Sequence, residues 1–133
     1  MKNLILAILI TFTFGALMTV EAQNNSQQVK IQIGKKKIVT KDKIKITFLS
    51  LIEDSRCPEG TNCIWAGNAK IKIEVQSKKR KEVFEINTNL GAKGATFEGY
   101  AINLTSLTPV PKENVRINRN SYVATFSVSR LTR

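Results

Sequence analysis

The chain of 133 residues contains no histidine. This absence excludes Ser-His-Asp and Cys-His hydrolases, histidine acid–base pairs and histidine-rich zinc sites. A pair of carboxylates is the familiar catalytic arrangement that remains, but the adjacent Glu53 and Asp54 would point to opposite faces of a strand. We therefore expect that the protein is not an enzyme and that it has neither a cofactor nor a metal site. A catalyst of an unfamiliar kind would need carboxylates that converge in a pocket.

Long apolar runs are absent except at the start of the chain. The run at residues 4–20 is followed by Val20-Glu21-Ala22, which has the small or apolar residues that a signal peptidase recognises. This pattern predicts a secretory signal peptide over residues 1–22, with an uncleaved membrane anchor as the alternative. We expect an exported protein, periplasmic or extracellular, in which residues 23–133 form one β-sandwich domain.

Cysteine is scarce, since only Cys57 and Cys63 are present. In an exported chain they are expected to form a disulfide, because the compartment beyond the membrane lacks the reductants that keep thiols free. Such a small ring stabilises the fold by about 2 kcal/mol on the chain-entropy model. The single tryptophan, Trp65, follows the ring. We expect it to be buried beneath the loop and mainly structural, with a binding role as the alternative.

Apolar stripes of helical period are also missing. From Val29 onward apolar and polar residues alternate instead, which predicts an all-β chain. The glycine-rich segment 87–99 is expected to be an irregular connection. About seven strands with turns at this spacing predict an antiparallel β-sandwich, with a partly open β-barrel as the alternative. The expected strands lie around residues 29–33, 44–48, 69–75, 84–86, 100–104, 115–117 and 122–128.

Negative charge is in short supply, with 10 acidic against 21 basic residues and a net charge of +11. A field of this size attracts anionic polymers and surfaces. The alternative is that the lysines keep turns and sheet edges soluble. Aromatic residues are not interleaved with the charges, so no specific nucleic-acid binding is expected. The candidate polyanion contacts are two basic runs, Lys35, Lys36, Lys37, Lys78, Lys79, Arg80 and Lys81.

Three acidic residues, Glu53, Asp54 and Glu59, lie close to the cysteine ring in sequence. Calcium requires six or more oxygen ligands, and this spacing matches no known calcium loop. We expect instead that Asp54 or Glu53 pairs with Arg56, or caps backbone amides of the loop, and so holds the ring in place. Asp54, Arg56 and Trp65 are therefore candidate residues of a binding or structural loop.

The segment Asp54-Ser55-Arg56-Cys57-Pro58, followed after four residues by Cys63-Ile64-Trp65-Ala66-Gly67, resembles a set of uncharacterised short exported bacterial proteins. Many of those proteins are lipoproteins. The resemblance is weaker over residues 99–104 and 122–128. It implies a β-rich fold, export and the disulfide, but no activity. The chain lacks the cysteine that lipoproteins carry at the cleavage point, so a lipid anchor is not expected.

Two functions of different classes remain. The first is an exported non-enzymatic binding or envelope-associated domain, for which an anionic polymer is a candidate ligand. The second is a small inhibitor or protein-interaction domain that presents the disulfide-braced loop to another exported protein, because a rigid loop loses less entropy on binding. Salt-sensitive binding to polyanions favours the first, and salt-tolerant capture of one protein favours the second.

Overall fold

The computed structural model describes residues 25–132. The expected signal peptide, residues 1–22, lies outside the described residues. The described part contains eight β-strands and one 3-10 helical turn, η1 (Arg119–Ser121). Within it, no helix is long and apolar enough to cross a membrane.

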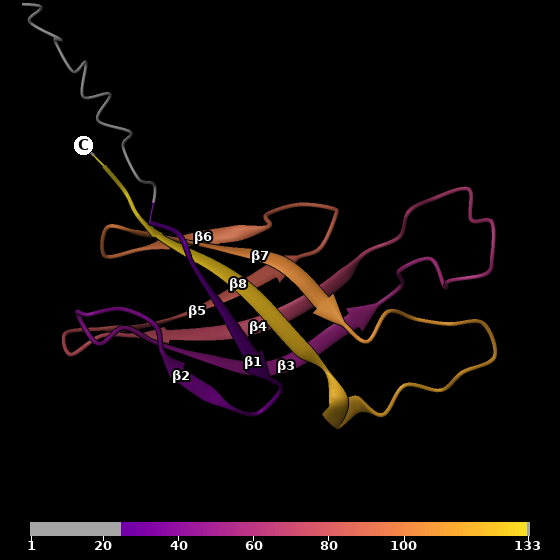
Figure 1. Ribbon diagram of the computed structural model, residues 1–133, viewed down its shortest axis with the longest axis horizontal. Coiled ribbons are helices and arrows are strands. Elements are labelled where there is room, and N and C mark those ends of the chain that lie inside the picture. Colours follow the sequence, from indigo (N-terminus) through magenta and orange to yellow (C-terminus); the bar gives the residue numbers. More distant parts are fainter. Residues whose placement is uncertain (1–24, 133) are drawn as a thin grey trace, which may run out of the picture.

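The strands form two antiparallel four-stranded sheets (Figure 1). One sheet has the order β1-β8-β7-β6 and the other the order β2-β3-β4-β5. The all-β prediction and the β-sandwich are thus confirmed, with eight strands rather than about seven. The strands are β1 (Gln27–Gln32), β2 (Lys36–Ile38), β3 (Lys45–Asp54), β4 (Ala69–Gln76), β5 (Lys81–Asn87), β6 (Gly94–Phe97), β7 (Tyr100–Thr108) and β8 (Val123–Arg130).

The core lies between the two sheets and contains the residues that alternate in the sequence. In β4 every second residue from Ala69 to Val75 is buried, and the residues between them are partly exposed. In the opposite sheet, Phe97 of β6 and Phe126 of β8 are fully buried. Burial of one such side chain contributes about 1.5–3 kcal/mol. The core therefore contributes far more to folding than a single small disulfide ring does.

The expected short strand at 115–117 is not a strand in the structure. The chain turns here instead, because Asn114 adopts a left-handed conformation with φ of 59°. The Val115 amide donates to the Lys112 carbonyl across this turn, at 3.2 Å. The apolar Val115 is 59% exposed, so its spacing from Ile117 does not reflect a shared buried face.

The segment 87–99 is not entirely irregular, because it contains strand β6. Gly94 opens this strand, and its lack of a side chain allows close contact with β7. A Cβ atom at Gly94 would overlap the Asn103 side chain and the Ile102 carbonyl oxygen. The glycine is therefore needed for the close pairing of β6 with β7 and does not indicate a loop.

The connections lie at two opposite ends of the sandwich. The β3–β4 loop, residues 55–68 and called here the disulfide loop, protrudes at one end beside the connection 109–118 (Figure 1). The β4–β5 turn lies at the other end, where β1 begins and β8 ends. Two register shifts in β3 precede the disulfide loop and bring Asp54 opposite the buried Ala69.

Candidate functional site

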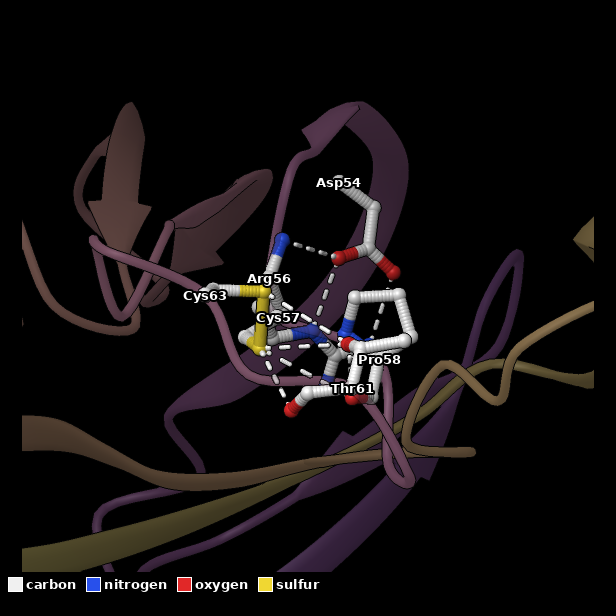
Figure 2. Close-up of a disulfide and its surroundings, with 6 residues drawn as sticks. All are labelled: Asp54, Arg56, Cys57, Pro58, Thr61 and Cys63. Carbon is white, nitrogen blue, oxygen red and sulfur yellow. Dashed lines mark hydrogen bonds and ion pairs between the residues drawn. A yellow bond between two sulfur atoms is a disulfide. The ribbon is translucent and has the colours of Figure 1, made fainter.

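Asp54 and Arg56 form a partly buried ion pair at the base of the disulfide loop. Their side chains are only 9% and 13% exposed. The Arg56 guanidinium donates from Nε to Asp54 Oδ1 at 2.8 Å and from Nη2 to Oδ2 at 2.7 Å. Figure 2 shows this two-point contact beside the disulfide. The sequence predicts that Asp54 or Glu53 pairs with Arg56, and the partner in the structure is Asp54.

The same guanidinium reaches across to the other sheet. Arg56 Nη1 donates to the Leu107 carbonyl at 2.6 Å, and Nη2 donates to the Pro109 carbonyl at 2.9 Å. The Tyr122 hydroxyl, just before β8, donates to Asp54 Oδ2 at 2.8 Å. Asp54, Arg56 and Tyr122, called here the clamp, thus join β3 to the ends of β7 and β8. Both Asp54 oxygens accept hydrogen bonds from Arg56 or Tyr122. This carboxylate is therefore not free to bind a metal ion.

The clamp shifts the pKa of two of its members in opposite directions. Desolvation raises the pKa of Asp54, but hydrogen bonds from Arg56 and Tyr122, together with the Arg56 charge, outweigh it and hold the pKa below its usual value. Desolvation and the hydrogen bond to the Asp54 carboxylate raise the pKa of Tyr122. The native clamp is therefore an ionised carboxylate with a protonated phenol.

The lowered pKa of Asp54 makes the clamp sensitive to acid. The folded state favours the ionised carboxylate of Asp54. The contribution of this carboxylate to the free energy of unfolding is therefore complete above its pKa in the unfolded chain, about 4, and is lost as pH falls through its lower pKa in the folded protein. We expect the wild-type free energy of unfolding to fall as pH decreases below about 4, more steeply than that of Asp54→Asn. Denaturant unfolding at a series of pH values measures both slopes. Glu113→Gln, on the exposed connection 109–118, removes the same charge and should keep the wild-type slope; equal slopes in all three proteins would contradict the prediction.

Cys57 and Cys63 form the predicted disulfide, with their Cα atoms 5.9 Å apart. A turn fills the ring, in which Thr61 donates through its hydroxyl to the Pro58 carbonyl at 2.7 Å. Gly60 takes a left-handed conformation in this turn, with φ of 87°. The ring is thus small and internally bonded (Figure 2), which suits a loop of fixed shape.

The two arms of the disulfide loop also pair with each other. The Ser55 amide donates to the Asn68 carbonyl at 2.7 Å, and the Cys57 amide donates to the Ala66 carbonyl at 3.2 Å. The Asn68 side chain is buried and accepts from the amides of Asn89 and Leu90 at 3.0 and 3.1 Å. These contacts fix the base of the loop to the neighbouring β5–β6 connection.

The ring itself is fastened to the connection 109–118. The Glu59 amide donates to the Pro111 carbonyl at 2.8 Å. The backbones of Glu59 and Lys112 also form an isolated parallel β-bridge. The disulfide loop is therefore held by the clamp, by its own arms and by two neighbouring connections. A loop anchored at so many points presents its remaining side chains in a defined position.

The large apolar side chains of the loop are those of Ile64 and Trp65, and both are exposed to solvent. Ile64 is 93% exposed and Trp65 is 81% exposed. The expected burial of Trp65 beneath the loop is therefore wrong. The space under the loop is filled by the Arg56 guanidinium, which bonds to the Leu107 carbonyl there. Ile64 was not among the predicted site residues, although Ile64-Trp65-Ala66 is an apolar triplet outside every alternating segment.

The seven cationic residues of the two basic runs are all exposed. They lie away from the disulfide loop. The second run occupies the β4–β5 turn and the start of β5, at the opposite end of the sandwich, and the first run lies in and before the edge strand β2. In the second run, Arg80 is engaged by the protein, because it lies 4.8 Å from the Phe97 ring centroid and 3.0 Å from Glu82. The two groups of predicted site residues therefore form two separate surfaces.

Sequence reasoning also missed Tyr122 as a partner of Asp54, since 68 positions separate the two residues and no local motif links them. Among residues 25–132, no group of three or more His, Cys, Asp or Glu side chains is arranged to hold a metal ion. Comparison of the chain with protein-family models, with curated proteins and with solved structures found no match.

Proposed function

We propose that this chain is a non-enzymatic binding domain that presents Ile64 and Trp65, on the disulfide loop, to a groove of another exported protein. The observation that carries the proposal is the 81% exposure of Trp65 next to the 93% exposure of Ile64. Adjacent large apolar side chains on a soluble domain mark an interaction surface. Tryptophan in particular dominates the binding energy of many protein interfaces.

The rigidity of the disulfide loop supports this role. Binding by a mobile loop costs conformational entropy for each side chain that becomes ordered. Here the disulfide, the Cys57–Ala66 pairing and the Asn68 contacts fix the loop before any partner arrives. The binding energy of the indole would then not be spent on ordering the backbone.

The chemistry of the loop base supports binding rather than catalysis. The buried carboxylate nearest the loop, Asp54, accepts from both Arg56 and Tyr122. Its lowered pKa keeps it ionised, and its oxygens face the Arg56 guanidinium and the Tyr122 hydroxyl. A general acid needs a proton to give and a reacting group within reach, and Asp54 has neither. Its role in this proposal is to hold the loop.

The test compares Trp65→Ala with the wild type in affinity capture from an envelope extract, with bound proteins separated and identified. We expect one protein to be retained by the wild type at both about 0.1 M and about 0.5 M salt and to be lost with Trp65→Ala. An interface hot spot contributes about 2 kcal/mol or more. The free energy of unfolding should change by no more than about 0.5 kcal/mol, because the side chain is exposed.

Val83→Ala is the matched control, because Val83 is 50% exposed on β5, away from the disulfide loop. It should retain the same protein as the wild type does. Retention of that protein by Trp65→Ala would remove the loop from the function. A large loss of stability in Trp65→Ala would show instead that the side chain is structural.

A further inference from the structure

A second surface, remote from the disulfide loop, consists of four adjoining open hollows. The largest, of about 520 Å³, lies between the turns at the end of the sandwich and is lined by Lys78 and Lys79. A hollow of about 420 Å³ shares Asp42 and Tyr100 with it. On the other side, a hollow of about 260 Å³ shares Ser77 and Lys78 with the first.

The fourth hollow, of about 430 Å³, shares Lys45 and Gln76 with the third and extends over the outer face of the β2-β3-β4-β5 sheet. Together the four hollows are called here the cationic track. The track links the two basic runs, because Lys35 and Lys36 line its one end and Lys78 lies in its middle. Lys35 and Lys36 of the first run and Lys78 and Lys79 of the second are thus parts of one surface, although they are far apart in the sequence.

Further cationic side chains line the track outside the two runs. Lys41 and Arg130 line the hollow that adjoins Asp42 and Tyr100, and Lys43 and Lys45 line the third hollow. None of these four residues belongs to a run of basic residues long enough to attract notice in the sequence. Together with the lysines of the two runs, these four residues place at least two cationic side chains in every hollow of the track.

The acidic side chains of the track are already engaged. The Tyr100 hydroxyl donates to Asp42 at 2.5 Å. Glu98 accepts from the Ser77 hydroxyl at 2.9 Å, and Glu74 lies 3.7 Å from the Lys81 ammonium. By contrast, within residues 25–132 the lysine and arginine side chains that line the four hollows form no ion pair with a carboxylate. Eight cations line the track against the three carboxylates of Asp42, Glu74 and Glu98, so the track has an excess of five positive charges.

The shape of the track selects a polymer over a small anion. Its cations are spread in pairs along successive hollows, whereas a site for one phosphate would gather several donors at one point. Nucleic-acid binders without sequence preference stack bases on aromatic rings. The track is lined by one such ring, Tyr100, whose hydroxyl is held by Asp42 and whose face lies 5.8 Å from the Arg130 guanidinium.

We infer that the cationic track binds a linear anionic polysaccharide, a sugar polymer with carboxylate or phosphate groups at regular intervals. Each hollow offers a pair of cations to one or two charged sugars. The inference goes beyond the proposed function, because the track and the disulfide loop lie on different parts of the fold and either can bind without the other.

The test measures binding of fluorescent polygalacturonate, a carboxylated polysaccharide, by anisotropy at several salt concentrations. The track variant combines Lys43→Ser, Lys45→Ser, Lys78→Ser and Lys79→Ser. We expect it to bind at least about tenfold more weakly than the wild type and to show a flatter dependence on salt, since fewer counterions are released. The variant Lys78→Ser with Lys79→Ser alone, confined to an exposed turn, should show the same direction of change and covers the case in which the quadruple variant does not fold.

The matched control removes four exposed cations outside the track, with Lys30→Ser, Lys93→Ser, Lys112→Ser and Arg116→Ser. It has the same net charge as the track variant and should bind like the wild type within about twofold. Equal weakening in the two quadruple variants would overturn the inference, because net charge alone would then explain binding. Tighter binding of single-stranded oligothymidylate than of polygalacturonate with the same number of charges would overturn it as well, in favour of nucleic acid.

Discussion

Arg56→Ala is expected to lower the free energy of unfolding by about 2–4 kcal/mol, because removal of one partner leaves a partly buried charge without compensation. The variant would leave Asp54, whose side chain is 9% exposed, without its cation. It would also leave the Leu107 and Pro109 carbonyls without the donors that now reach them. Urea unfolding monitored by circular dichroism measures the change.

Arg116→Ala is the control for this experiment, because Arg116 is exposed on the connection 109–118, and we expect a change within about 0.5 kcal/mol. Arg56→Lys keeps the charge but not the two-point contact with the carboxylate, so its stability should lie between those of Arg56→Ala and the wild type. An Arg56→Ala protein as stable as Arg116→Ala would show that the clamp does not hold the two sheets together.

Gly67→Ala is expected to destabilise the fold by about 2–4 kcal/mol, from backbone strain and steric overlap together. Gly67 has φ of 71°, in the left-handed region. A Cβ atom there would overlap the Ser55 carbonyl oxygen and approach Arg56 Cα to 2.8 Å. Since these are backbone atoms, relief requires the two arms of the disulfide loop to separate.

Gly60→Ala separates strain from overlap. Gly60 has φ of 87°, yet a Cβ atom there would meet nothing within 4 Å. We expect a cost of about 1–2 kcal/mol, from the left-handed conformation alone. Thermal or denaturant unfolding compares the two variants. If they were equally stable, the close approach of the arms at Gly67 would not matter to the fold.

Alternation of apolar and polar residues was enough to locate the long strands, because each has a stretch with one buried and one exposed face. Strand β4 is the clearest case, with strict alternation from Ala69 to Gln76. The alternation gave only the first half of β3, because two register shifts interrupt it after Phe48. The pattern missed β2, in which all three residues are exposed, so that no apolar face exists to detect. It also gave a false strand at 115–117, where Val115 is exposed and only Ile117 packs against the core.

The disulfide loop was predicted in its covalent frame but not in its orientation. The pairing of Cys57 with Cys63 follows from their short separation. Charge predicts a partner for Arg56 but does not choose between Glu53 and Asp54. The exposure of Trp65 does not follow from the local sequence, because it depends on what occupies the space beneath the loop. That space is taken by Arg56, which bonds to the carbonyls of Leu107 and Pro109. Those acceptors lie 51 and 53 positions away, beyond the reach of any local pattern.

The placement of the strand ends has a practical consequence for any fusion protein. The eight residues of β4 span about 26 Å at 3.3 Å per residue, and they separate the disulfide loop from the end of the sandwich where β8 finishes. A fluorescent protein attached after β8 would sit beside Arg130, which lines the cationic track, and well clear of Trp65. On the two proposals above, such a fusion should hinder binding of a polysaccharide at the track while leaving binding of a protein at the disulfide loop unchanged.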